Sequence, residues 1–424
     1  MSTEILDVRG IKVANIKNYS DIVFFGIGVL AGSNYETPEI AGIAHFGEHL
    51  FFKGTEKQNW KQLNEEFAKL GIEKNAYTSN NEVLYHATCP KENLESTIEF
   101  MLDMFFNSTM PPEEMEKERN VIKEEKKMSD DDPKMVFASA VGNNFFNWTV
   151  GHDTIGTNET IQNITRKNII DYLRDKTTRQ NIVFICCGDI SSDDLKRYIE
   201  KNIPKYHVYL RDLASGLNNT GCTSIWTDLV KKPDNVKFIL EKENITQSSA
   251  YMILNALAHD DPMYYPERIL YAYLGGGSYS RLFSRIRDEL GLCYSVGMCS
   301  LTLDYPQHQI GNIYGYLASE NIDRFMLESE KICQDTMKNG LNKDVFECAK
   351  TDYLSSLLRV TETSAGKAHY LSRKFLFYKN TSVSMEESVK NIRNVTIEDC
   401  NDVAKISLNN QYNWAIMISK KRLI

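Results

Sequence analysis

The stretch "AGIAHFGEHLFFKGT", Ala41 to Thr55, places two histidines and a glutamate in an otherwise apolar segment. Residues four apart lie on the same face of an α-helix, so His45 and His49 can direct their imidazoles at one point. A second face of the same helix is apolar and suited to burial: Ile43, Phe46 and Leu50. Neutral imidazoles on successive turns chelate Zn²⁺, and Glu48 projects beside them, so the stretch predicts a metal-binding helix.

A catalytic zinc ion needs a third protein ligand and an open position for water. The best candidates lie in "EKERNVIKEEKKMSDDDP", where Glu118 and Glu125 are two helical turns apart and share a face. The apolar contacts of this helix are expected from Val121, Ile122 and Met128. A run so rich in Glu and Lys is usually a solvated helix. Spacing alone does not separate Glu125 from its neighbour Glu124 as the ligand.

The composition is that of an ordinary globular protein. Of 424 residues, 42% are hydrophobic and 25% are charged, and the length predicts two or three domains. The formal net charge of -8 disfavours nucleic acid and anionic membranes as partners and is weakly compatible with basic peptides. No apolar run reaches the roughly eighteen residues needed to span a bilayer.

Two further features favour a cytoplasmic location. The start, "MSTEILDVRG", lacks the pattern of a secretory signal or a transit peptide. The nine cysteines include no C-x-x-C pair, and the adjacent Cys186 and Cys187 lie in an apolar, strand-like run. We therefore expect reduced thiols in a cytosol-like compartment.

Segments typical of strands alternate with segments typical of helices along the chain. Strands are predicted at 21–33, 82–89 and 181–190, and helices at 41–53, 60–70, from Pro112 onward and around 282–290. The hydrophobic periodicity fades between about 205 and 235, and the second half shows the same alternation of strand-like and helix-like segments as the first. We therefore divide the chain into an N-terminal zinc-binding domain at 1–205, a linker at 206–235 and a C-terminal domain at 236–424.

The order H-x-x-E-H, followed some 75 residues later by E-R-N-V-I-x-E-E, resembles the pitrilysin/insulinase superfamily of inverted-motif zinc peptidases. Further matches are "NAYTSNNEVLYHATC", "GHDTIGTNETI" and "LGGGSYSRLFSRIRDELGLCYSV". They point to the short-chain branch, which holds mitochondrial processing peptidase and its bacterial relatives. The resemblance implies an α+β fold with two similar domains, each a mostly antiparallel sheet with helices packed on it.

The resemblance also assigns roles at the positions that match the motifs. It implies one zinc ion per chain, held by His45, His49 and Glu125. Glu48 becomes the general base acting on a zinc-bound water, and Glu118 an acidic partner that orients a ligand imidazole. The implied reaction is hydrolysis of short or unfolded peptides in an enclosed chamber.

Substrate contacts follow from the same resemblance. The strand equivalent to Asn75 and Ala76 borders the cleft in the family, and an extended peptide adds to its edge. In the second domain, which has no zinc motif, Arg287 and Tyr294 match an Arg…Tyr pair that grips the substrate or the oxyanion. From the residues alone, these are an ordinary turn asparagine, an exposed arginine and a half-buried tyrosine.

Three functional hypotheses compete. The first is an active zinc endopeptidase, and the second is a non-catalytic structural or chaperone-like subunit of a processing-peptidase-type complex. The third is an enzyme that needs a second, different chain. Since this chain carries the full zinc set together with Arg287 and Tyr294, the resemblance favours an active homodimer over a heterodimer, because four such domains enclose the chamber and this chain supplies two.

Overall fold

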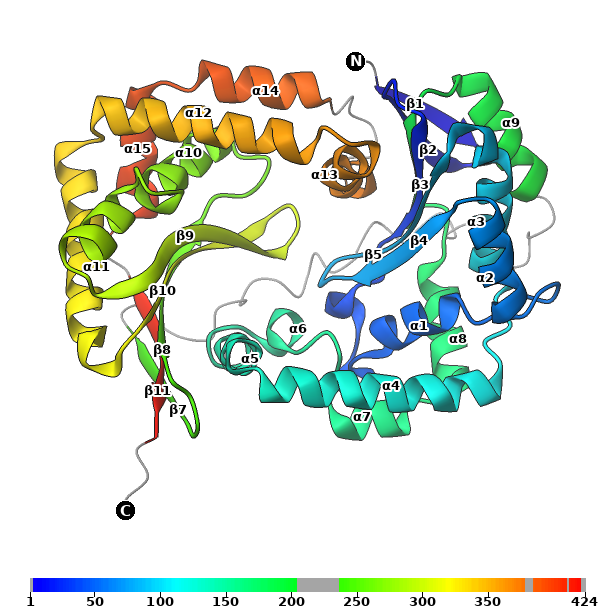
Figure 1. Ribbon diagram of the computed structural model, residues 1–424, viewed down its shortest axis with the longest axis horizontal. Coiled ribbons are helices and arrows are strands. Elements are labelled where there is room, and N and C mark those ends of the chain that lie inside the picture. The colour runs from blue at the N-terminus through cyan, green and yellow to red at the C-terminus, as the bar shows by residue number, and fades with distance from the viewer. Residues whose placement is uncertain (1–2, 204–235, 378–383, 410–411, 421–424) are drawn as a thin grey trace, which may run out of the picture. The chain divides into compact units, whose positions relative to one another are not determined.

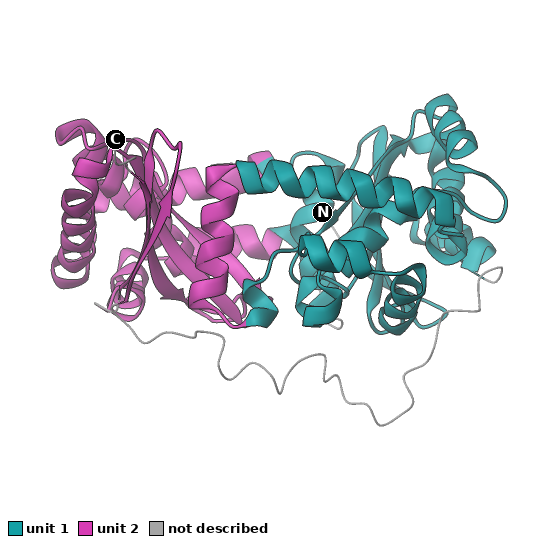
Figure 2. Cartoon of the chain, turned by 90° about the horizontal axis from the view of Figure 1, so that it is seen from below, with its two compact units in different colours: residues 1–131, 148–229, 360–385 teal, residues 132–147, 230–359, 386–424 magenta. Residues whose placement is uncertain are grey.

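The computed structural model describes residues 3–203, 236–377, 384–409 and 412–420 (Figure 1). Contacts group the described residues into two compact units, each with its own sheet (Figure 2). Unit 1 draws on residues 1–131, 148–229 and 360–385, and unit 2 on residues 132–147, 230–359 and 386–424.

This grouping differs from the contiguous division expected from the sequence at two segments. Residues 132–147 join the C-terminal unit, and residues 360–385 return to the N-terminal one. The expected linker at 206–235 lies outside the described residues. Each unit therefore completes its core with a helix supplied from the other half of the chain.

The sheet of unit 1 has strand order β1-β2-β6-β3-β5-β4, and β2 and β6 are its parallel pair. Its strands are β1 (Thr3–Val8), β2 (Ile11–Lys17), β3 (Ile22–Val29), β4 (Glu73–Thr78), β5 (Val83–Pro90) and β6 (Ile182–Gly188). Because β4 pairs with β5 alone among the described strands, β4 forms one edge of the sheet.

Helices cover both faces of this sheet. Its longer helices are α1 (Ile43–Phe51), α2 (Trp60–Lys69), α3 (Leu94–Asn107), α4 (Pro112–Asp131), α8 (Arg166–Lys176), α9 (Ser192–Asn202) and α13 (Ser364–Phe377). Shorter turns are η1 (Ser33–Tyr35), η2 (Pro38–Ile40), η3 (Lys91–Asn93), α6 (Trp148–Gly151) and α7 (Asn158–Asn163). Helix α13 packs on β3 and β6 from one side, whereas α1 and α3 lie on the opposite side (Figure 1).

Polar contacts hold α13 on the sheet of unit 1 although it comes from late in the chain. Ser364 Oγ donates to the backbone carbonyl of Ile22 at 2.9 Å, and Lys367 Nζ donates to Asn18 Oδ1 at 2.9 Å. Arg373 Nε donates to Glu82 Oε1 at 2.6 Å, where the Glu82 side chain is fully buried. Such buried charged contacts are specific in geometry and favour the docking position of α13 seen here.

Unit 2 has a five-stranded sheet of order β7-β11-β8-β10-β9, in which β7 and β11 are parallel and the other pairs antiparallel. Its strands are β7 (Lys237–Lys242), β8 (Ser248–Ala256), β9 (Cys293–Asp304), β10 (His308–Leu317) and β11 (Asn413–Ser419). Its helices are α5 (Pro133–Phe145), α10 (Tyr264–Gly275), η6 (Phe283–Glu289), η7 (Ser319–Asn321), α11 (Ile322–Asn339), α12 (Lys343–Val360), α14 (Met385–Asn394) and α15 (Ile397–Ser407).

The predicted α+β class, with two similar domains of mostly antiparallel sheet and packed helices, is confirmed. Within the described ranges, no helix combines the length and the apolar character needed to cross a membrane. The eight cysteines in those ranges are free thiols.

The segment predicted as a helix around 282–290 differs from expectation in its winding. Residues Phe283–Glu289 form a π-helix, and Gly291, with φ of +60°, lies just after its end. Leu282 and Ile286 are fully buried, as expected of a helix with one apolar face, but the backbone is wound more widely than in an α-helix. Short π-helical segments are rare and frequently occur at functional sites.

Two glycines in and before α1 differ in how much room they leave for a side chain. Gly42 has φ of +90°, and a Cβ there would lie 2.2 Å from the backbone oxygen of Ile155. Gly47 is helical, and a Cβ there would lie 3.5 Å from Leu173 Cδ2, an ordinary contact. We expect Gly42→Ala to destabilise unit 1 by about 2 kcal/mol or more, because strain and a backbone clash add.

Gly47→Ala is the control, and we expect it to be neutral or to stabilise by up to about 1 kcal/mol because alanine favours helix. The measurement is the urea unfolding midpoint of the full chain, kept metal-free with a chelator. Equal midpoints for the two variants would contradict this account of the start of α1.

Candidate metal centre

A buried carboxylate fixes the first turn of α1. Glu36 Oε2 accepts the Gly42 N–H at 2.8 Å, and Oε1 accepts the Ala44 N–H at 2.9 Å. The same Oε2 lies 3.1 Å from His152 Nε2. Burial raises the pKa of Glu36, while the hydrogen bonds with His152 and the two amides act in the opposite direction. A carboxylate on the free amides of a helix N-terminus both caps them and matches the helix dipole.

Neither Glu36 nor His152 is identified from the sequence. The capping residue lies six positions before Gly42, outside the usual S-x-x-E spacing of an N-terminal cap. No short-range pattern therefore identifies it. His152 is 116 positions further along the chain, and only the fold brings it to Glu36.

Helix α4 lies against α1 and presents its acidic residues to it. Arg119 anchors α4: its guanidinium lies 5.2 Å from the centre of the Phe46 ring and donates to the carbonyls of Ile161 and Ile164. Of the expected apolar contacts, Ile122 is buried, as predicted. The expectation for Val121 and Met128 is wrong, because they are 49% and 73% exposed. Arginine stacking and carbonyl contacts replace the apolar packing that was expected of them.

Three side chains converge between α1 and α4. His45 Nε2 lies 3.7 Å, and His49 Nε2 3.5 Å, from the same oxygen, Glu125 Oε2. One ligand atom from each of the three residues can be chosen so that all three atoms lie within 4.8 Å of one another. Within the described ranges this is the one group of three His, Cys, Asp or Glu side chains spaced to hold a metal ion.

The geometry fits a tetrahedral zinc ion. Ligand atoms 2.0–2.1 Å from such an ion lie about 3.3 Å apart, close to the distances found here. Two imidazole nitrogens and one carboxylate oxygen are also the donor set of many catalytic zinc sites. Glu125 is 44% exposed, so the centre is open to water on that side.

The two histidines differ in protonation. Burial, together with the neighbouring His49, lowers the pKa of His45 to about 4, so this imidazole is neutral at pH 7 and has a lone pair to donate. For His49, burial acts to lower the pKa, but hydrogen bonds to Glu118 and Glu125 outweigh it and raise the pKa to about 9. The carboxylates that favour a proton on His49 would also favour a metal cation at this position.

Glu118 fixes the orientation of His49. Its Oε2 lies 3.0 Å from His49 Nδ1, and its Oε1 lies 2.5 Å from Lys53 Nζ. Burial acts to raise the pKa of Glu118, but the hydrogen bonds to His49 and Lys53 outweigh it and lower that pKa. When Nδ1 donates its proton to Glu118, the Nε2 lone pair points to Glu125 and the candidate centre.

Glu48 lies one residue from a candidate ligand and has a partner that sequence reasoning missed. Thr78 Oγ1 donates to Glu48 Oε2 at 2.5 Å. Burial raises the pKa of Glu48, and the Thr78 hydrogen bond acts against that rise. Thr78 ends strand β4, so the sheet edge and the acid are directly connected.

The structure places Asn75 and Ala76 in the edge strand β4. Asn75 is exposed, and its Oδ1 accepts the Ala76 N–H at 2.9 Å. The simple turn interpretation of Asn75 is therefore wrong, because the residue is extended and pairs with His86 of β5. An added peptide strand would compete with the Asn75 side chain for the Ala76 amide.

Arg287 and Tyr294 lie together in unit 2. The Arg287 guanidinium is 4.8 Å from the centre of the Tyr294 ring and 4.5 Å from that of Phe283. Within the described part of the chain, Arg287 forms no ion pair. Tyr294 is 77% exposed, which contradicts the expected half-buried tyrosine. Both side chains are thus free to meet a ligand.

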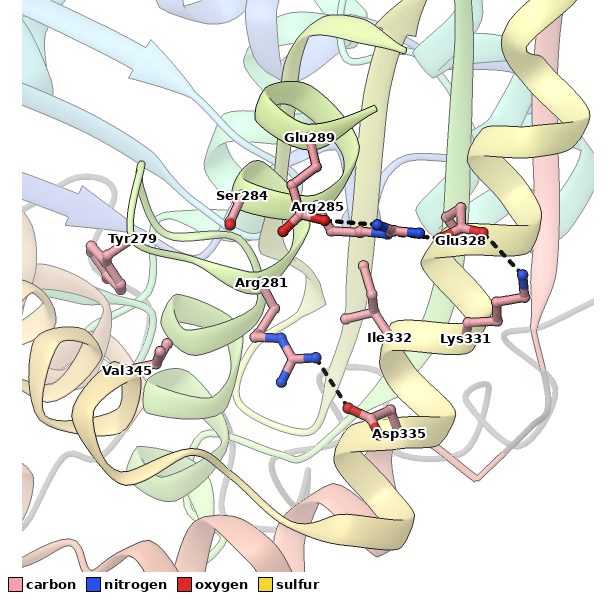
Figure 3. Close-up of a pocket in the computed structure, with 10 residues that line it drawn as sticks. All are labelled: Tyr279, Arg281, Ser284, Arg285, Glu289, Glu328, Lys331, Ile332, Asp335 and Val345. Carbon is pink, nitrogen blue, oxygen red and sulfur yellow. Dashed lines mark hydrogen bonds and ion pairs between the residues drawn. The ribbon is translucent and has the colours of Figure 1, made fainter. Parts of the chain in front are cut away.

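A surface pocket of about 370 Å³ in unit 2 is a weaker candidate (Figure 3). Its charged side chains neutralise one another: Arg281 pairs with Asp335 at 3.0 Å, and Glu328 pairs with both Arg285 and Lys331. Paired charges have little left to offer a ligand. The cluster on α1 and α4 is therefore the better candidate.

Comparisons with known proteins agree with this choice. A family model described as Insulinase (Peptidase family M16) matches residues 12–158, which contain the whole cluster. A second, described as Peptidase M16 inactive domain, matches residues 163–353. Together the two models cover most of the chain.

Relatives of similar length carry the name of zinc proteases. An uncharacterized zinc protease, YmxG, of Bacillus subtilis is 27% identical over 93% of this chain and 92% of its own length. An uncharacterized zinc protease of Rickettsia felis is 27% identical over 90% of this chain and 88% of its own length.

Solved structures share the fold. A protease from Helicobacter pylori superposes with a TM-score of 0.85 at 17% identity, over 98% of this chain and 99% of its own. A peptidase M16 inactive domain from Pseudomonas fluorescens gives 0.83 at 16% identity, over the full length of both chains.

Substitutions on α4 test which acid holds the metal. We expect Glu118→Gln to weaken zinc binding about 10- to 100-fold, because outer partners of ligands have effects of that size. Glu125→Gln should weaken it more, because a direct ligand is lost. Glu124→Gln is the matched control: its side chain pairs with Lys127, away from the cluster, and zinc affinity should not change.

The measurement is zinc titration against a competing chelator. The assignment of Glu125 as the third ligand fails if Glu124→Gln weakens binding as much as Glu125→Gln does.

Proposed function

Because this chain belongs to the pitrilysin/insulinase superfamily of M16 peptidases, we propose that it is a zinc metalloendopeptidase that hydrolyses short or unfolded peptides in an enclosed chamber. The observation that carries the proposal is the convergence of His45 Nε2, His49 Nε2 and Glu125 Oε2, with Glu48 beside them. A single zinc ion per chain, held by these three residues, would lower the pKa of a bound water and polarise the peptide carbonyl.

The chain's own groups move the proton and hold the geometry. Glu48 accepts a proton from the attacking water and delivers it to the leaving amine. Thr78 holds the Glu48 carboxylate through Oε2, so the acid has a fixed position when the water arrives. Glu118 keeps His49 in the tautomer whose Nε2 can bind the metal.

The substrate backbone is held by strand addition. The edge strand β4, with Asn75 and Ala76, offers main-chain groups to an extended peptide. Such pairing requires an extended segment and does not read side chains, which favours unfolded peptides over folded proteins. Tyr294 and the unpaired Arg287 supply donors for the developing oxyanion.

The partners and the location follow from composition. The free thiols of the described cysteines support a cytoplasmic enzyme. The net charge of -8 repels nucleic acid and anionic membranes. At long range it also favours basic over acidic peptides.

Replacing the general base separates binding from turnover. We expect Glu48→Gln to keep one zinc ion per chain and to lower peptide cleavage by at least about a hundredfold, since a positioned general base contributes 10²–10⁴-fold. The measurement is cleavage of a mixed peptide library by mass spectrometry, with metal content taken on the same sample. A chelator should abolish cleavage by the unmodified chain.

Normal cleavage by zinc-loaded Glu48→Gln would show that the base is another group. Zinc binding without any cleavage by the unmodified chain would favour the non-catalytic subunit.

We propose further that the active form is a homodimer in which Arg287 and Tyr294 of one protomer serve the partner's metal centre. Mixing two inactive variants tests this arrangement. A hybrid of Glu48→Gln and Arg287→Ala chains contains one centre with an intact base and an intact arginine. Random pairing should therefore restore about a quarter of normal activity, because half the dimers are hybrids with one complete site of two.

The mixture stays inactive if Arg287 serves the metal centre of its own chain. Mixing Glu48→Gln with Glu125→Gln is the control, because no arrangement of these two chains rebuilds a centre. Restored activity in that control would point to contamination by the unmodified chain.

A further inference from the structure

Lys74, on the edge strand β4, is a cation without an acidic partner: no carboxylate of the described residues lies within ion-pair distance of its Nζ. It is half-buried, with Nζ 4.3 Å from the centre of the Phe52 ring and 5.5 Å from that of Phe67. Burial and the nearby Lys53 lower the pKa of Lys74. Lys53 itself is bound to Glu118, so it does not compete for another anion.

The register of the sheet directs Lys74 toward the same side as the general base. Lys74, Ala76 and Thr78 alternate along β4 and pair with Ala87, Tyr85 and Val83 of β5. Those three β5 residues belong to the core that contains α1. Side chains two apart in a strand share a face, and Thr78 on this face binds Glu48. Lys74 therefore stands on the α1 face, about 13 Å along the strand from Thr78.

We propose that Lys74 binds a carboxylate of the substrate and so selects peptides with an acidic group on one side of the scissile bond. The proposal rests on the proposed peptidase function. A peptide added along β4 carries its own alternating side chains past Lys74, two to four residues from the bond that Glu48 serves. A carboxylate there gains a charge-assisted hydrogen bond to an ammonium that lacks one.

The charge of the whole chain points the other way, and distance decides between the two effects. The net charge of -8 favours basic peptides as they approach. At physiological salt, interactions between exposed charges fade beyond about 8 Å. Once a peptide lies on β4, the nearest unpaired charges act on it more strongly than the remote ones. Among the described residues of β4, the unpaired charge on the α1 face is Lys74, whereas Glu73, which also forms no ion pair, lies on the opposite face.

The carboxylate can come from an Asp or Glu side chain or from the C-terminus of a short peptide. A different role for Lys74 is packing alone, in which its stem covers Phe52 and Phe67 and its ammonium stays in water. These cases differ in how cleavage depends on the peptide sequence.

The test uses capped peptides that carry Glu, Gln or Lys at one position at a time, from four residues before to four residues after the scissile bond. A second set keeps Gln throughout and has either a free or an amidated C-terminus. The zinc-loaded chains are the unmodified one, Lys74→Met, which keeps the apolar stem, Lys74→Glu, and Lys196→Gln. Lys196 lies on α9, which packs on β1 at the opposite edge of the sheet, and it controls for net charge.

We expect the unmodified chain to favour Glu over Gln about three- to tenfold in kcat/KM at positions on one side of the bond. Lys74→Met should lose the preference, Lys74→Glu should reverse it toward Lys, and Lys196→Gln should keep it. A preference confined to free C-termini would assign the contact to the terminal carboxylate, and it would support the proposal if Lys74→Met abolished it.

Equal rates for Glu and Gln peptides, or a preference that survives Lys74→Met, would overturn the inference while leaving the peptidase intact. If no peptide is cleaved, the proposed function fails, and the inference then depends on binding to zinc-loaded Glu48→Gln. Fluorescence anisotropy of labelled Glu and Gln peptides measures that binding, and equal affinities would overturn the inference as well.

Discussion

The contact between α1 and α4 is the constraint on which the candidate site depends. His45 and His49 come from one helix, but Glu125 reaches them because Arg119 joins α4 to Phe46 and to the carbonyls of Ile161 and Ile164 at the end of α7. Glu36, which is hydrogen-bonded to His152, fixes the first turn of α1 and so positions the helix that carries both histidines. The side chains of His45, His49 and Glu125 are partly exposed to solvent. The side chains that position them are buried: Glu36, Arg119 and His152. The geometry of the centre is therefore set by the core.

Electrostatics adds a second constraint, because three carboxylates share a small, partly buried region. Burial and the charge of Glu125 raise the pKa of Glu48, while Lys53 and the proton on His49 offset the charge of Glu118. A metal dication would offset these carboxylates more strongly than a single proton on His49, because it carries two charges. Metal binding at such a site stabilises the folded chain as well as supplying chemistry, because an unfolded chain has no preformed cluster.

Local patterns predicted the parts of the site that lie within a helix. The i, i+4 histidines and the apolar face of Ile43, Phe46 and Leu50 predicted α1, and the two-turn spacing predicted the shared face of Glu118 and Glu125. Choosing Glu125 over Glu124 as the ligand needed the family resemblance. Which of these two adjacent side chains points toward α1 depends on how α4 docks, and the sequence pattern does not show this.

What the sequence did not reveal was long-range or irregular. Glu36 and Thr78 act through contacts across 8 and 30 positions. The exposure of Val121 and Met128, the π-helical winding beside Arg287 and the return of α13 to unit 1 all depend on tertiary packing. No single-sequence periodicity contains that information.

The edge strand connects the chemistry with the choice of substrate. Backbone pairing along β4 contributes similar binding energy for every extended peptide, and energy shared equally by all substrates cannot discriminate among them. Selection therefore has to come from the few side chains of β4 that face the bound peptide. Ala76 is small and Thr78 is engaged with Glu48, which leaves Lys74 as the side chain of this face with an unused interaction. Strand β4 therefore suits a peptidase of broad specificity, in which backbone pairing holds any extended peptide and Lys74 adds a preference for one charge.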